Sequence, residues 1–79
     1  MLVNIRETHK STDIKDIVSI DVPGIESNFQ ILNNHDNLVS LLKKGTLKYK
    51  DINGKQYTLD IERSGIIYVS NNNVKIILV

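Results

Sequence analysis

The residues of this 79-residue sequence that most resemble a catalytic pair are the neighbours His35 and Asp36. An imidazole beside a carboxylate could act as a general base with an orienting acid. Neighbouring residues on a loop rarely face each other, however, and no sequence motif indicates an activated nucleophile. The other histidine, His9, shares no local metal-ligand spacing with His35. The sequence therefore predicts no catalytic residue, no metal site and no cofactor, and it places both histidines on the solvent side or at an interface.

The four glycines form no phosphate-binding loop, because neither G-x-G-x-x-G nor a P-loop pattern is present. Each glycine lies where a strand is expected to end, so a turn explains it. The residues predicted to build these structural turns are Pro23, Gly24, Gly45, Gly54 and Gly65.

A short stretch of the chain carries four lysines that could form a basic patch: Lys43, Lys44, Lys48 and Lys50. Small β-barrels bind single-stranded nucleic acid with such grooves and with stacking aromatic residues. Here Tyr49 and Tyr57 fall on the apolar faces of their strands, and nearby carboxylates dilute the positive charge. The net charge of +1 also argues against strong phosphate neutralisation. Cross-strand pairing of lysines with carboxylates is the favoured interpretation, and a nucleic-acid-binding β-barrel is the alternative function.

The elements that must position these residues are strands. Isoleucine, valine and threonine recur, while alanine and cysteine are absent, so disulfides and thiolate metal sites are excluded. Turn signals cut the chain into about seven or eight short strands with hairpin connections. With 41% hydrophobic residues in 79, residues 1–79 are predicted to form one all-β domain, a flattened antiparallel β-sandwich, with a small closed barrel as the alternative.

The alternation of apolar and polar residues gives the individual strands. Residues 7–15 are expected to form a polar loop, and Asn53-Gly54 predicts a type I′ hairpin turn. Asn71-Asn72-Asn73 is expected to turn the chain before its last strand. The predicted strands are residues 2–6, 17–22, 29–32, 38–42, 46–52, 55–62, 66–70 and 74–79.

The apolar runs are far shorter than the ~20 residues needed to span a bilayer. The first residues show no basic segment followed by an apolar one, the pattern of a secretory signal. The chain is therefore expected to be soluble, unprocessed and intracellular.

Residues 20–50 show a recognisable spacing, reading IDVPGIESNFQILNNHDNLVSLLKKGTLKYK. This stretch resembles the epsilon subunit of F-type ATP synthase, called delta in mitochondria. The family pattern is roughly V-x-V-P-G-x-x-G-x-F-G-I-L-x-x-H-x-P-L-V-x-x-L-x-x-G-x-L. Residues 65–74, GIIYVSNNNV, resemble the family's G-F-V-E-V-x-x-N-x-V. The matching positions in the first stretch are Val22, Pro23, Gly24, Phe29, Ile31, Leu32, His35, Leu38, Val39, Leu42, Gly45 and Leu47.

The sequence also departs from the family pattern. Ser27 and Gln30 stand where the family favours glycine, and Asn37 replaces the usual proline. Asn28 takes the place of an acidic residue that often meets the ring of c subunits. The family commonly adds an α-helical hairpin after the sandwich, whereas this sequence stops at Val79. Two explanations of this ending stay open, a natural short form and a chain cut after the last strand. The apolar residues 76–79 would be unusual at a random cut and favour the natural form, which lacks the C-terminal α-helical hairpin and its brake on rotation.

The resemblance implies a non-catalytic rotor subunit of the central stalk. Its partners would be the gamma subunit and the c-subunit ring, with no nucleic acid, and it would couple them so that proton translocation drives ATP synthesis. Membrane association would come only through the complex, at the cytoplasmic face of the bacterial inner membrane. One end of the sandwich would face the c-ring, through residues Glu26, Ser27, Asn28, Phe29, Gln30, Asn33, Asn34 and His35.

The resemblance also implies that one outer sheet face docks on gamma. Permanent interfaces are more hydrophobic than the rest of a protein surface, so this face is expected to be apolar. The last strand fits that expectation, because Ile76 and Leu78 alternate with Ile77 and Val79. The remaining strands of the gamma-facing surface are not assigned by the sequence.

Overall fold

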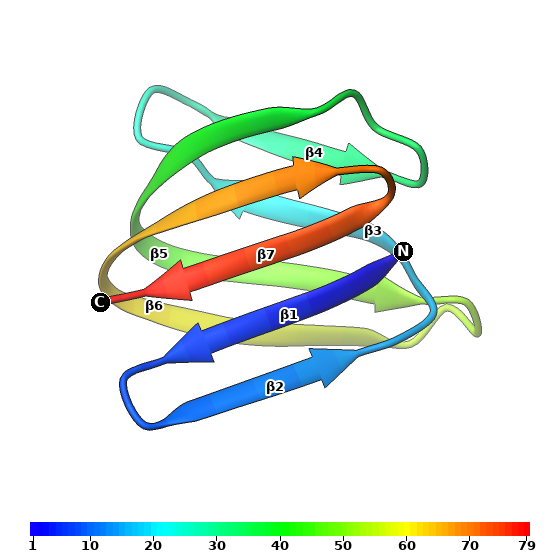
Figure 1. Cartoon of the computed structure of the whole chain (residues 1–79), viewed down its shortest axis with the longest axis horizontal. Coiled ribbons are helices and arrows are strands. Elements are labelled where there is room, and N and C mark those ends of the chain that lie inside the picture. The colour runs from blue at the N-terminus through cyan, green and yellow to red at the C-terminus, as the bar shows by residue number, and fades with distance from the viewer.

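The computed structural model describes all 79 residues and contains seven strands and no helix (Figure 1). It therefore has no helix that is long and apolar enough to cross a membrane. All strands belong to one sheet with the order β2-β1-β7-β6-β5-β3-β4, which confirms the all-β prediction. The strands are β1 (Leu2–Glu7), β2 (Lys10–Ile14), β3 (Ile17–Pro23), β4 (Asn28–Leu32), β5 (Leu38–Asp51), β6 (Gln56–Ser70) and β7 (Asn73–Leu78).

Two long strands fold this single sheet into two layers. β5 and β6 have 14 and 15 residues and pair antiparallel along almost their whole length. Their register shifts between Lys43 and Gly45, where both strands curve around the end of the molecule (Figure 1). The front layer contains β2, β1, β7, the second half of β6 and the first half of β5. The back layer contains the first half of β6, the second half of β5, β3 and β4.

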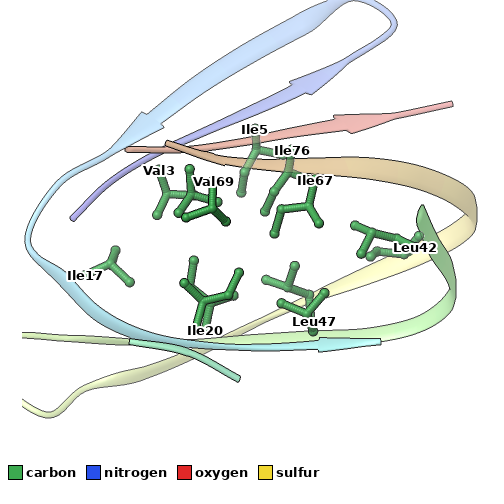
Figure 2. Packing of buried hydrophobic residues seen from close by; sticks show 13 residues of the cluster. Val3, Ile5, Ile17, Ile20, Leu42, Leu47, Ile67, Val69 and Ile76 are labelled. Carbon is green, nitrogen blue, oxygen red and sulfur yellow. The ribbon is translucent and has the colours of Figure 1, made fainter. Parts of the chain in front are cut away.

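The space between the layers is filled by aliphatic side chains, as Figure 2 shows. Thirteen buried residues form one cluster, and no polar or charged residue is buried. Removing this apolar surface from water is the main driving force for such a fold. The cluster members are Val3, Ile5, Ile17, Ile20, Val22, Ile31, Leu42, Leu47, Ile61, Ile67, Val69, Val74 and Ile76.

One predicted loop is a strand. Residues 7–15 contain β2, which pairs antiparallel with β1, so the loop prediction is wrong. β2 is a sheet edge whose only large apolar residue is Ile14, and such an edge lacks the alternating apolar residues that mark a half-buried strand. The predicted antiparallel pairing is present at five of the six strand contacts, and β1 and β7 run parallel.

Two of the predicted turns lie inside strands. Gly45 belongs to β5 and Gly65 to β6, so the prediction of turns at these two glycines is wrong. Gly45 follows the register shift that lets β5 bend. Gly65 lies against β7 so closely that a Cβ atom would come within 2.7 Å of the Ile77 carbonyl oxygen. Close approach of two backbones, rather than a turn, requires glycine there.

The type I′ hairpin turn lies at Asn71-Asn72 and not, as predicted, at Asn53-Gly54. Of Asn53 and Gly54, only Gly54 has a positive φ (84°). Its N–H donates to the Asp51 carbonyl at 3.0 Å, so the connection is a longer loop with glycine in the left-handed position. Asn71 and Asn72 have φ values of 50° and 61° between the paired residues Ser70 and Asn73. Two successive positive φ angles are the mark of a type I′ turn. Pro23 and Gly24 do end a strand, as predicted.

Candidate functional site

The two histidines lie in different loops and do not form a site. His9 is exposed in the turn between β1 and β2, and His35 lies between β4 and β5. The Nδ1 atom of His35 is 2.7 Å from the backbone oxygen of Asp36, so the imidazole contacts the main chain instead of the neighbouring carboxylate. The chain contains no group of three or more residues that could hold a metal ion.

Six of the eight residues expected to face a c-ring lie at opposite ends of β4, and the other two, Phe29 and Gln30, lie within the strand (Figure 1). Residues 26–28 lie before this strand and at its first position, whereas residues 33–35 follow it. Five residues of extended chain separate the two ends by about 13 Å. The expectation that one end of the sandwich carries both segments is therefore wrong. Their closeness in the sequence hid this separation, because an intervening strand carries the chain from one end to the other.

The segment before β4 presents three free polar residues. Ile25 anchors the loop to β5, since its N–H donates to the Leu41 carbonyl at 3.0 Å. Phe29 packs against the core and the Gln30 amide donates to the Asp21 carboxylate at 2.8 Å. The exposed side chains left between these anchors are Glu26, Ser27 and Asn28, and none of them forms a hydrogen bond within the chain.

The segment after β4 is tied to the rest of the protein. The Asn33 side-chain oxygen accepts from the Met1 amine at 2.9 Å. The Asn34 N–H donates to the side-chain oxygen of Asn72 at 2.8 Å. A further bond joins the Asn71 N–H to the side-chain oxygen of Asn37 at 3.2 Å. These contacts cross from the back layer to the front layer, so this loop closes the end of the sandwich.

The four lysines do not form one groove. Lys43 continues the outward row of Val39 and Leu41 on the front layer, while Lys48 and Lys50 point outward from the back layer. Lys48 lies opposite Asp21 of β3, which matches the expected pairing of lysines with carboxylates. The tyrosines that could stack on bases instead stack on each other, with ring centroids 5.1 Å apart on the inner side of β5 and β6.

The outer side of the front layer carries a continuous row of apolar side chains, called here the apolar face. Leu41, Ile66 and Ile77 lie side by side on β5, β6 and β7, and Val39 and Tyr68 form the next row. Val39 is 64% exposed and Leu41 is 53% exposed. The apolar face consists of Leu2, Val39, Leu41, Ile66, Tyr68 and Ile77.

A shallow groove of about 230 Å³ continues the apolar face between Leu2 and Tyr68. Asn4 lies at its side and donates to the Asp13 carboxylate at 2.7 Å and to the Ser11 hydroxyl at 3.1 Å. Arg6 and Lys75 share this side of the layer. The charges bordering the face on β1 and β7 are therefore positive.

The outer side of the back layer has the opposite character. Its outward positions on β3, β5 and β6 are polar or charged, and Leu32 of β4 is its one large exposed aliphatic side chain. These positions are Ser19, Asp21, Thr46, Lys48, Lys50, Gln56, Thr58 and Asp60. A charged, mixed surface of this kind is typical of a solvated face.

Sequence reasoning found only part of the apolar face, the residues of the last strand. The missed signal was a set of adjacent apolar pairs, Leu41-Leu42, Ile66-Ile67 and Ile76-Ile77. In a strand, neighbouring side chains point to opposite sides. Each pair therefore places one residue in the core and one on the outer surface.

The two groups whose pKa values depart clearly from their ordinary values are Asp51 and Tyr57, which lie at the β5–β6 hairpin. Partial desolvation raises the pKa of Asp51, but hydrogen bonds from the Lys55 N–H, the Tyr57 hydroxyl and the Asn53 N–H outweigh it. The pKa of Asp51 therefore lies below its ordinary value of 3.8. The same bond to the carboxylate, followed by desolvation, raises the pKa of Tyr57 above 10.0. These groups hold the hairpin and are not arranged for catalysis.

Comparison with protein families gives one match that covers nearly the whole chain. Residues 3–78 match the model described as ATP synthase, Delta/Epsilon chain, beta-sandwich domain. The chain is 34% identical to an ATP synthase epsilon chain of Clostridium botulinum over 68 residues, which are 86% of this chain and 50% of that protein. It is 32% identical to that of Campylobacter hominis over 62 residues, 78% of this chain and 48% of the relative. The chain thus spans about half the length of the curated relatives it matches.

Solved structures share the fold at low sequence identity. A chain in the central stalk/c-ring structure of the Tetrahymena thermophila mitochondrial ATP synthase has a TM-score of 0.80 at 19% identity, covering 98% of this chain and 61% of that one. A chain in the OSCP/F1/c-ring structure of the Euglena gracilis mitochondrial ATP synthase has a TM-score of 0.90 at 19% identity, covering 99% and 49%.

The Asp51 carboxylate at the β5–β6 hairpin makes the free energy of unfolding depend on pH. Because the folded-state pKa of Asp51 is depressed, its contribution is present above the unfolded value of 3.8 and is lost as the pH falls through the folded pKa. We expect Asp51→Asn to lower the free energy of unfolding at pH 7, and we expect the difference from wild type to shrink below about pH 4. Urea unfolding measured from pH 7 to pH 2 tests this.

The matched control is Asp36→Asn, which removes a carboxylate that accepts no hydrogen bond in the structure. It should change the unfolding free energy little at any pH. An Asp51→Asn variant whose stability deficit stays constant down to pH 2 would contradict the electrostatic account of the hairpin.

Proposed function

The chain belongs to the ATP synthase delta/epsilon chain family, as its β-sandwich domain, and we propose that it couples the gamma subunit to the c-ring in the central stalk. The family membership confirms the resemblance seen in residues 20–50. The proposed role is mechanical. The sandwich transmits torque between the two partners, so that proton translocation drives ATP synthesis elsewhere in the complex, and it makes and breaks no bond itself.

The apolar face is the observation that carries the proposal for gamma. It joins four strands on one side of a domain whose other outer side is polar. A large exposed apolar patch on a soluble domain typically marks an interaction site. A subunit that must stay attached during rotation needs a stable interface, and such interfaces are the more hydrophobic ones. We therefore assign gamma to the outer side of β5, β6, β7 and β1.

The loop before β4 is the segment that we assign to the c-ring. The side chains of Glu26, Ser27 and Asn28 are exposed and form no hydrogen bond within the chain, so they are free to bind a partner. The polar character of this loop suits contact with the polar loops of a membrane ring. Asn33, Asn34 and His35, by contrast, lie in the loop that closes the other end of the sandwich.

The architecture suits a rigid coupling element. β5 and β6 pass through both layers, so a force on the front layer reaches the back layer along continuous hydrogen-bonded strands. The buried aliphatic cluster resists shear between the layers because cores are packed as densely as crystals. These 79 residues contain no helix. Its membrane association is peripheral, through the complex, at the cytoplasmic face of a bacterial inner membrane.

A charge placed on the apolar face should disrupt gamma binding. We expect Tyr68→Glu to weaken binding of the chain to the gamma subunit of the same organism by at least about tenfold, because a carboxylate would be desolvated in the interface. The matched control is Thr58→Glu, which adds the same charge to the same strand on the polar outer side. Titration calorimetry with purified gamma measures both. Equal affinities for the two variants would contradict the assignment of this face.

The two ends of β4 can be distinguished by cross-linking, since the chain has no natural cysteine. In the assembled complex, Ser27→Cys labelled with a photoactivatable maleimide should cross-link to the c subunit. Asp36→Cys, at the other end of β4, should not. The reverse pattern would place the asparagine-rich loop at the ring and would overturn the orientation proposed here.

A further inference from the structure

An exposed sheet edge lies at the start of β5. The first half of β5 pairs with β6 on one side only. On its other side, the contacts with the main chain are the isolated bridge between Gly24 and Leu42 and the hydrogen bond from the Ile25 N–H to the Leu41 carbonyl. Beyond Ile25 the chain turns away, and nothing pairs with the strand at Val39.

The bond at Leu41 fixes the direction of the neighbouring backbone groups. In an antiparallel strand, alternate residues direct both their N–H and their C=O to the same side. Because the Leu41 carbonyl points away from β6 toward Ile25, the N–H and C=O of Val39 also point away from β6. Ser40 and Leu42 take the opposite direction and pair with Ile67 and Gly65. Val39 thus presents an unused donor and acceptor at an open edge.

The open edge is also one wall of a groove of about 370 Å³. The other wall is the loop before β4, and the groove is lined by Gly24, Ile25, Glu26, Ser27, Phe29, Val39, Ser40 and Leu41. Half of these residues are hydrophobic. Glu26 is the one charged residue among them. The side chains of Val39 and Leu41 continue directly into the apolar face.

We propose that the edge at Val39 receives an extended segment of the gamma subunit, which adds a short strand to the front layer beside β5. The inference rests on the proposed function, because it identifies gamma as the partner. A free N–H and C=O on an exposed edge are satisfied by an extended backbone, the mode known as strand addition. Gly24 and Ile25 already pair with this edge, and the added segment continues their line.

The lining of the groove defines the chemistry of that segment. Its side chains that enter the groove are apolar, to match Ile25, Phe29 and Leu41. Continuity with the apolar face means that one partner can cover both surfaces. Long exposed edges are normally protected against pairing with other chains, whereas this one carries a β-branched residue that is 64% exposed.

Amide hydrogen exchange tests the proposal residue by residue. In the free chain, the Val39 amide should exchange quickly, and the Ser40 and Leu42 amides, which point toward β6, should be protected. On forming the complex with gamma, the Val39 amide should become protected by at least about tenfold, the usual effect of a stable added hydrogen bond. A complex that forms while the Val39 amide stays fast would overturn strand addition and leave the proposed function standing.

Two variants at Val39 separate the contribution of its backbone N–H to gamma binding from the contribution of its side chain. Val39→Pro removes the outward N–H without touching the ladder to β6, and proline is tolerated on edge strands. Val39→Ala removes most of the side chain and keeps the N–H. We expect Val39→Pro to bind gamma about tenfold more weakly than Val39→Ala, as the hydrogen bond donated by the Val39 N–H is lost. Equal binding by the two variants would contradict the proposal.

Two further readouts keep the result interpretable. Urea unfolding of both variants checks that Val39→Pro is folded at the temperature of the binding assay. Exchange in the free chain is repeated at ten times the protein concentration. Val39 protection that appears on concentration alone would assign the edge to a second copy of this chain and overturn the gamma assignment. Failure of the wild-type chain to bind gamma at all would instead count against the proposed function.

Discussion

The antiparallel pairing of β5 with β6 is the interaction on which the rest of the structure depends. These two strands run through both layers, and their shared bend near Gly45 turns one continuous sheet back on itself. Only because the sheet folds there do the inward side chains of the two halves meet and exclude water. The bend also decides which residues face outward on each layer. The apolar face and the polar outer side are therefore consequences of the same strand pair.

The proposed function follows from the difference between the two outer surfaces and not from any reactive group. The histidines lie in separate loops, and the perturbed acid, Asp51, is engaged in a hairpin. The domain instead has the apolar face on one outer side, the polar loop before β4 at one end, and the unpaired edge of β5 between them. The chain belongs to the ATP synthase delta/epsilon chain family, and in the proposed role these surfaces attach it to its partners.

The sequence predicted the elements whose pattern is local. Alternation located β3, β4 and most of β5, β6 and β7, and the spaced motif in residues 20–50 identified the family. β2 was missed because a polar edge strand carries no apolar alternation. Gly45 and Gly65 were interpreted as turns because their true causes, a bend and a close backbone approach, involve residues distant in the sequence. The position of residues 26–28 and 33–35 at opposite ends of β4 likewise depends on the fold.

In the proposed role, the outer side of the front layer binds the gamma subunit. Methyl cross-saturation from unlabelled gamma to the isotopically labelled chain measures this directly, because the outer side of the front layer carries isoleucine, leucine and valine methyl groups and Leu32 provides methyl groups on the back layer. The account predicts strong saturation transfer to Val39, Leu41, Ile66 and Ile77, and none to Leu32 on the back layer. Transfer centred on Leu32, with the front-layer methyl groups unaffected, would contradict it.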